Sequence, residues 1–284
     1  MAIDYDHLMS LRARDERFSY TDRDTMLYAL AVGMGRDPLD QNELAYVYEG
    51  SGLRTVPTMA SAVAWSGLLE DCGWDFSRVL HGEERLTLHQ PLPDAGTLLL
   101  DSKVTAVHDK GPDKGAVIYT ESQARRENDG GAVFTLGRTI IARADGGFGG
   151  SPGSGRQAHP IPKGEPDLSC TLRTRSDQAL VYRLCGDRNP LHANPALARR
   201  LGFPVPILHG LCTSGIACRA ILKTICEYDH TLINEFDVRF SAPVFPGETI
   251  VTEMWQEANI ISFRVRVQER DLIVLNHGRC VLTT

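Results

Sequence analysis

Alternating apolar and polar residues indicate several strands along the chain. The clearest runs with a period of two are Val104–His108, Val117–Glu121, Ile260–Val267 and Leu272–Leu282. In each half of the chain such strands follow one another without an intervening helical pattern. The pattern therefore predicts antiparallel sheets and an α+β architecture.

Two segments have the apolar pattern of a helix that a sheet surrounds. Gly210–Cys226 carries apolar residues at a spacing close to 3.6, which is the helical period. Pro57–Leu69 begins with a residue favoured in the first helical turn and is apolar on nearly every side. We therefore expect long central helices near 57–70 and 210–227, each wrapped by its own antiparallel sheet.

Landmarks of the first half recur in the second half at a nearly constant offset. Pro91 recurs as Pro243, 152 positions later, and other landmarks recur at offsets of 152 to 154. The segment 146–165 is rich in glycine and proline and has the composition of a linker that is flexible and then stiffer. The repeat therefore predicts two related domains, 1–145 and 166–284, on either side of this linker.

Composition narrows the class of protein. The 284 residues are 42% hydrophobic, which is enough for two cores, and no apolar run approaches the ~20 residues that cross a bilayer. The formal charge is −6, the pI is near 5.9, and no run of Lys and Arg exceeds two, so neither a nucleic-acid nor a membrane partner is indicated. Seven cysteines without a C-x-x-C pair and a start without an apolar signal segment predict a cytoplasmic protein with reduced thiols.

The densest group of polar residues lies in one short turn. Asp187, Asn189 and His192 fall within six residues, and Pro190 between them fixes the backbone. Asn194 then has the character of a helix N-cap, so the turn lies between two helices. A carboxylate and an imidazole that share one water suit acid–base catalysis. The alternatives are an Asx turn for Asp187 and a purely structural role for His192.

Two other chemistries suit this segment less well. Asp187, His192 and His209 have the residue types of a facial metal triad, but no H-x-x-x-H pair or carboxylate cluster accompanies them, so we expect no metal. Cys185 lies close to Asp187, whose charge raises a thiol pKa and opposes nucleophilic catalysis. His209, which precedes Gly210, is either a packing residue at a helix start or a part of the site.

Two long motifs carry a resemblance to a known family. The run Tyr182–His192, followed by Gly202–Thr213, resembles the signature of the (R)-specific 2-enoyl-CoA hydratases, type 2, within the MaoC-like dehydratases. The resemblance continues in the first half through Glu43–Gly50, Leu80–Glu83 and Asp109–Gly111. It implies a double hotdog fold, with two sheets joined edge to edge and a first half that has lost its catalytic turn. It also implies reversible hydration of trans-2-enoyl-CoA to (R)-3-hydroxyacyl-CoA without a cofactor.

The resemblance assigns roles to individual residues. Asp187 and His192 would be the catalytic pair, with Asn189 on the same turn. Gly210, at a helix start, would offer a backbone N–H to the oxyanion that develops on the thioester carbonyl. Glu49 would be the supporting acid from the first half. The remaining acyl-CoA contacts would come from His81, Gly82, Lys110, His209 and Phe240.

Several alternatives remain open at this point. A hotdog acyl-CoA thioesterase would bind the same thioester but would not need the Asn-Pro-Leu-His turn, and a non-catalytic acyl-CoA-binding protein would tolerate its loss. Lys110 either contacts the phosphates of CoA or is a solvated lysine in a hairpin turn. The small residues of Ala60–Gly67 either leave room for an acyl tunnel or pack closely against a sheet. We also expect a homodimer.

Overall fold

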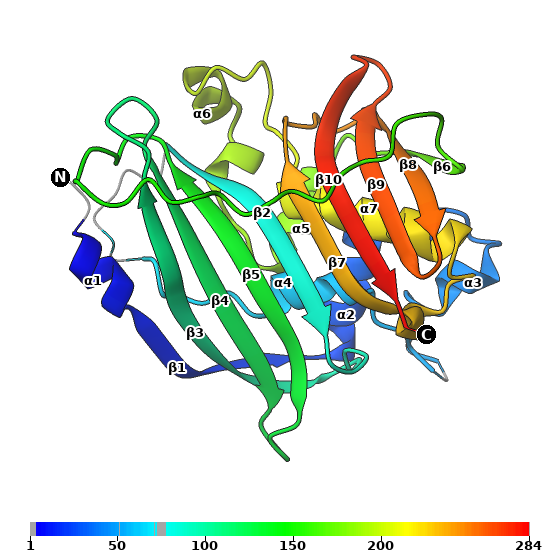
Figure 1. The fold of residues 1–284 in the computed structure, drawn as a ribbon. Coiled ribbons are helices and arrows are strands. Elements are labelled where there is room, and N and C mark those ends of the chain that lie inside the picture. Colours follow the sequence, from blue (N-terminus) through cyan, green and yellow to red (C-terminus); the bar gives the residue numbers. More distant parts are fainter. Residues whose placement is uncertain (1–3, 51, 71, 73–77, 284) are drawn as a thin grey trace.

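The computed structural model describes residues 4–50, 52–70, 72 and 78–283. Within them, ten strands form one antiparallel sheet in the order β1-β3-β4-β5-β2-β7-β10-β9-β8-β6 (Figure 1). The first half contributes β1 (Arg12–Tyr20), β2 (Val79–Leu88), β3 (Gly96–Asp109), β4 (Ala116–Arg126) and β5 (Ala132–Ala142). The second half contributes β6 (Leu168–Arg173), β7 (Ile233–Phe240), β8 (Thr249–Glu257), β9 (Ile260–Val267) and β10 (Leu272–Leu282).

The two halves of the sheet are related by a two-fold arrangement about the junction of β2 and β7. Outward from this junction, the first half continues through β5, β4, β3 and β1, and the second half through the equivalent strands β10, β9, β8 and β6. At the junction Arg85 pairs with Asp237, which lies 152 positions later in the chain. An antiparallel pair between equivalent residues is what a local two-fold axis requires. The predicted α+β halves with antiparallel sheets joined edge to edge are therefore confirmed.

Short helices accompany the sheet, and α2, α4, α5 and α7 lie on the same side of it in Figure 1. The helical elements are α1 (Tyr5–Ser10), α2 (Asp22–Ala31), α3 (Gln41–Leu44), η1 (Pro57–Met59), α4 (Ala60–Val63), α5 (Gln178–Tyr182), η3 (Arg183–Cys185), η4 (Pro190–His192), α6 (Pro195–Arg200), α7 (Gly210–Thr224) and η5 (His230–Leu232). The helix predicted near 210–227 is confirmed as α7, whose side chains are mostly buried. It ends at Thr224, shortly before Glu227 and Tyr228 adopt left-handed φ angles.

The long helix predicted near 57–70 is wrong. The segment forms only the 3₁₀ turn η1 and one turn of α4, and at Ala64 the backbone becomes extended. The buried guanidinium of Arg138 donates to the carbonyl of Ser61 at 3.1 Å, which a continuing helix would have used for the N–H of Trp65. Tertiary contacts therefore override the apolar pattern, and the described residues of the first half contain no counterpart of the full length of α7.

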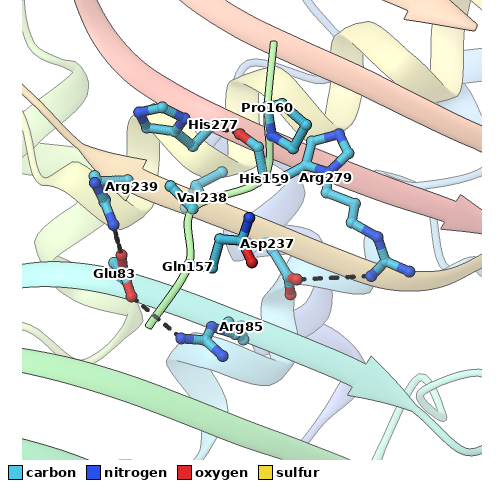
Figure 2. A pocket seen from close by; sticks show the side chains of 11 residues that line it. Glu83, Arg85, Gln157, His159, Pro160, Asp237, Val238, Arg239, His277 and Arg279 are labelled. Atoms are coloured by element: carbon cyan, nitrogen blue, oxygen red, sulfur yellow. Dashed lines mark hydrogen bonds and ion pairs between the residues drawn. The ribbon is translucent and has the colours of Figure 1, made fainter. Parts of the chain in front are cut away.

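The linker is bound to the sheet. The carbonyl of His159 accepts a hydrogen bond from Nδ1 of His277 at 2.8 Å, and Nε2 of His159 lies 2.7 Å from Oγ of Ser262. Figure 2 shows this stretch of the linker passing over the junction, above Asp237 and Arg279. A polar cavity of about 400 Å³ lies between the linker and β2, β7 and β10. Composition predicted a linker that is flexible and then stiffer, and these contacts of His159 hold the proline-rich, stiffer part against the sheet.

Candidate active site

The turn between η3 and η4 fixes the Asp187 carboxylate. Gly186 precedes it with a φ of +136°, which a residue with a side chain adopts only under strain. Oδ1 of Asp187 accepts the N–H of Asn189 at 3.0 Å, and Oδ1 of Asn189 accepts the N–H of Leu191 at 3.0 Å. The Asx turn is therefore real, but it uses only one carboxylate oxygen. The other oxygen, Oδ2, faces His192.

His192 is a buried, neutral imidazole with one free acceptor. Nδ1 lies 2.9 Å from the carbonyl of Ile207, and because a carbonyl can only accept, Nδ1 carries the proton and Nε2 keeps its lone pair. Burial lowers the pKa of His192 from its ordinary value, although the Ile207 carbonyl and Asp187 act in the opposite direction. Nε2 lies 4.0 Å from Oδ2 of Asp187. Two acceptors at this distance do not bond each other, but one water can donate to both.

His209 holds the turn through a hydrogen bond and a ring stack. Its Nε2 donates to the backbone carbonyl of Asp187 at 3.1 Å, and its ring stacks on that of His192 with centroids 3.6 Å apart. The ring of Tyr182 also packs against His209, with ring centroids 4.9 Å apart. Burial, followed by the neighbouring His192, lowers the pKa of His209, so this imidazole is neutral as well. Of the two interpretations of His209, the contacts favour a packing and positioning role.

The N-terminus of α7 lies near the turn, because the residue before it, His209, is hydrogen-bonded to the Asp187 carbonyl. Gly210 is the first residue of α7, and no side-chain hydrogen bond caps this end of the helix. The first N–H groups of a helix have no intrahelical partner and attract negative charge. A Cβ on Gly210 would lie 2.9 Å from the ring of Phe240, so a larger residue there would require this ring to move. Phe240 in turn packs against His81, with ring centroids 4.8 Å apart. The structure thus brings His81, Phe240 and Gly210 together.

Two adjoining cavities lead from the turn into the first half. The smaller has about 170 Å³ and reaches Asp187 and Leu211. The larger has about 280 Å³ and is lined mainly by apolar residues of the first half. Four residues line both cavities: Ala62, Trp65, Cys185 and Gly186. The space that the broken helix leaves beside α4 therefore adjoins the cavity at Asp187.

Comparisons with known proteins match each half of the chain to a known domain family. The MaoC like domain matches residues 157–277, and the MFE-2 hydratase 2 N-terminal domain matches residues 18–144. The peroxisomal enoyl-CoA hydratase 2 of Arabidopsis thaliana is 37% identical to this chain, over 95% of this chain and 93% of its own length. The chain belongs to the enoyl-CoA hydratase 2 family of MaoC-like dehydratases. It is an enzyme of the hydro-lyase class, as the sequence motifs predict.

Two further relatives align with nearly the full length of this hydratase. The 3-hydroxyacyl-thioester dehydratase Y of Mycobacterium tuberculosis is 40% identical over 92% of both chains. The crystal structure of a MaoC-like dehydratase from Phytophthora capsici superposes with a TM-score of 0.86 at 31% identity, over 99% of this chain and 98% of that one. The double hotdog fold implied by the motifs is confirmed by this similarity and by the strand order.

Glu49 lies on the side of the hydratase away from the turn of Asp187 and His192. It is exposed, and it follows α3 on a loop whose neighbours contact the other end of α7: Tyr46 and Arg54 both donate to the carbonyl of Tyr228. The 15 residues of α7 separate this end from Gly210 by roughly 20 Å at 1.5 Å per residue. The structure therefore does not bring Glu49 to the site.

Lys110 and Gly82 have structural partners in the hydratase. The ammonium group of Lys110 binds the carbonyl oxygens of Pro152 and Gly153 in the linker, the second at 3.3 Å. Lys110 is followed by a tight turn in which Gly111 has a φ of +88°. Gly82 is buried at a bulge of β2, where a Cβ would lie 3.0 Å from the side chain of Ile141. Gly82 directly follows His81 on β2, whereas the ammonium group of Lys110 is turned toward the linker.

Three side chains that could bind a metal lie close together, but they are oriented for hydrogen bonds. One ligand atom each of Asp187, His192 and His209 lies within 4.8 Å of the others. The rings of the two histidines are only 26° from parallel, so their in-plane lone pairs do not converge on one point. The Nε2–H of His209 is also committed to the Asp187 carbonyl. This geometry does not suit a metal, and the expectation of a metal-free site stays a prediction.

Cys185 is not a nucleophile in this structure. It is largely enclosed between the two cavities, and burial, followed by the charge of Asp24, raises its pKa to about 12. A thiol with that pKa carries almost no thiolate near neutral pH. The sequence argument reached the same conclusion from Asp187, whereas in the structure the causes are burial and Asp24.

Two buried ion pairs were missed by the sequence analysis. Glu84 binds Arg138 at 3.0 Å beside the catalytic cavity, and Glu43 binds Arg219 of α7 at 2.6 Å. Glu43 lies in the same motif as Glu49, and it is the acid of that motif which reaches α7. Because ion pairs of this kind join residues far apart in the chain, no local pattern could have found them.

Proposed function

We propose that this hydratase adds water reversibly to trans-2-enoyl-CoA and produces (R)-3-hydroxyacyl-CoA. The observation that carries the proposal is the 4.0 Å separation of His192 Nε2 and Asp187 Oδ2 next to the uncapped N-terminus of α7. Nε2 of His192 and Oδ2 of Asp187 can both accept protons from one water. The N–H groups at the start of α7 can donate to the negative charge that develops on the thioester oxygen. The names of the Arabidopsis and Mycobacterium relatives support both directions of the reaction.

The water is activated between Asp187 and His192. It donates its protons toward the carboxylate and the free Nε2, which raises the nucleophilicity of its oxygen. That oxygen forms a bond to the β-carbon, the double bond breaks, and its electrons move onto the thioester carbonyl as an enolate. One proton of the water is taken by the pair, and a proton is then delivered to the α-carbon. The net change is the addition of one water, so no oxidant, reductant or cofactor is required.

The start of α7 stabilises the enolate. The N–H groups at Gly210 and the following residue are the donors that a thioester oxygen meets when it approaches the turn. The helix dipole adds to their effect because it favours negative charge at an N-terminus. One such donor is typically worth about 3 kcal/mol of activation free energy. Phe240 disfavours a side chain at position 210 and so keeps these donors accessible.

Each part of the substrate has a counterpart in the structure. The acyl chain extends from the small cavity at Asp187 into the larger apolar cavity of the first half. The CoA arm leaves past His81 and Phe240, which pack beside Gly210. The first half therefore binds the substrate, and the second half carries the chemistry. We further propose that the enzyme is a cytoplasmic homodimer; no described helix is long and apolar enough to cross a bilayer.

One assay separates this function from the two alternatives. With crotonyl-CoA, hydration removes the absorbance of the conjugated double bond without releasing a thiol, and a chiral analysis should find only the (R)-3-hydroxy product. A thioesterase would release free CoA, and a non-catalytic binding protein would leave the absorbance unchanged. Either of these two results would overturn the proposal.

A further inference from the structure

Trp65 occupies an unusual position for a large aromatic side chain. It is 49% exposed, yet it lines both the cavity at Asp187 and the apolar cavity of the first half. The other residues shared by the two cavities are Ala62, Cys185 and Gly186, all of which are small. Trp65 is therefore the only side chain between the two described cavities that is large enough to close one off from the other.

The backbone on both sides of Trp65 is anchored. Before it, the carbonyl of Ser61 accepts from Arg138 at 3.1 Å. After it, the N–H of Gly67 donates to the carboxylate of Glu16 at 3.2 Å, and the Ser66 hydroxyl binds the same carboxylate. These contacts end the helix at α4 and direct the indole toward the cavities rather than into the core.

The ring of Trp65 is also held directly. The guanidinium of Arg138 lies over it, 4.4 Å from the ring centroid, which is a cation–π contact. Arg138 is buried and binds the carboxylate of Glu84, which His81 contacts at 2.9 Å. Although burial acts to raise it, Arg138 and His81 lower the pKa of Glu84 to about 2, so the carboxylate stays charged. A buried network of charged groups thus holds the indole through Arg138, while about half of Trp65 remains exposed.

Resting on the hydration proposed above, we infer that Trp65 determines acyl-chain selectivity by forming the partition between the two cavities, with Arg138 as its positioning residue. A four-carbon acyl group fits the small cavity without passing Trp65. A ten-carbon group has to displace the indole from Arg138 in order to enter the apolar cavity. The energetic cost of that displacement falls on long chains alone, so the partition lowers the preference for long substrates.

The test is the selectivity ratio, defined as kcat/KM for trans-2-decenoyl-CoA divided by kcat/KM for crotonyl-CoA. We expect Trp65→Ala to raise this ratio about tenfold or more, the scale on which one or two methylenes in an apolar pocket are discriminated. Trp65→Phe should give an intermediate ratio. Arg138→Lys keeps the charge opposite Glu84 but loses the planar stacking group, and it should shift the ratio in the same direction by a smaller factor.

The chain offers a matched control. Trp255 on β8 also lies under an arginine, with the guanidinium of Arg264 at 5.2 Å from its ring, but it lines neither cavity. Trp255→Phe should leave the ratio unchanged, whereas Trp65→Phe should raise it. A folded Trp65→Ala variant with an unchanged or lowered ratio would overturn the inference.

Binding can be measured without turnover. Calorimetry with the unreactive butyryl-CoA and decanoyl-CoA should show the same shift toward the longer chain in Trp65→Ala. If wild-type protein fails to hydrate crotonyl-CoA while these affinities still shift, the partition stands and the proposed reaction fails. If wild-type protein hydrates crotonyl-CoA and neither the affinities nor the ratio shift, the partition alone fails.

Discussion

The free Nε2 of His192 lies 4.0 Å from Oδ2 of Asp187, and both atoms are hydrogen-bond acceptors. Their other polar atoms are already committed, Nδ1 of His192 to Ile207 and Oδ1 of Asp187 to Asn189. The two free acceptors are therefore held at the separation that one shared water bridges. This relationship links the turn sequence to the chemistry, because the hydrogen bonds that build the turn are the ones that leave these two atoms unused.

Loss of either group should abolish most of the activity. Asp187→Asn and His192→Gln should each lower kcat for crotonyl-CoA hydration by about 100-fold or more, since a positioned acid–base group contributes 10²–10⁴-fold. The melting temperature should show that both variants are folded. Asp177→Asn is a suitable control because Asp177 pairs with Arg175 at the surface. Near-normal turnover in a folded Asp187→Asn protein would remove the acid–base account.

The pH dependence of kcat/KM should follow the neutral form of His192. Burial lowers the pKa of this imidazole, so the acceptor at Nε2 is present at neutral pH and is lost only when the pH falls through that lowered pKa. We expect kcat/KM to be flat near pH 7 and to fall on an acidic limb that begins below the ordinary histidine pKa of about 6.5. A rate that increases as the pH falls from 7 to 5 would mean that the protonated imidazole is the active form.

His209 should also make the stability pH-dependent. Its folded pKa is lowered, mainly by burial, so below about pH 6.5 the unfolded chain takes up a proton that the folded protein resists. The stability that this group contributes is present above pH 6.5 and is lost as the pH falls through its folded pKa. We expect the melting temperature of wild type to fall more steeply between pH 7 and pH 5 than that of His209→Gln. Parallel curves for the two proteins would contradict the assignment.

Chelation should leave the enzyme active. The stacked rings of His192 and His209 do not direct their lone pairs at one ion, and the water between the acceptors needs no metal. Activity after EDTA treatment and desalting should equal that of untreated protein. Activity lost to EDTA and restored by zinc would show that the turn is a metal centre.

The sequence predicted those features that depend on local chemistry and on the internal repeat. Asp187, Asn189 and His192 follow one another on a turn that Pro190 constrains, and the repeat predicted two related halves. Only the family resemblance implied that their sheets join edge to edge, which the β2–β7 junction shows. The extent of the first helix was not predictable, because it ends where Arg138, far along the chain, takes the carbonyl of Ser61.

The motifs did not predict the partners of long charged side chains. Lys110 is on the predicted turn, yet its ammonium group reaches the linker backbone. Within the motif Glu43–Gly50, Glu43 is the acid that pairs with α7, whereas Glu49 is exposed. A motif places a backbone segment, but the partner of a flexible charged side chain depends on which distant elements pack beside it.

The most direct test of the central claim is the double variant Asp187→Asn/His192→Gln, compared with both single variants in crotonyl-CoA hydration. Residues that act on one shared water form a unit, and removing the second member of a unit costs little once the first is gone. We predict that the double variant retains about the same residual kcat as the slower single variant. A kcat loss equal to the product of the two single losses would show that the two residues act independently, and it would contradict the account of one water held between them.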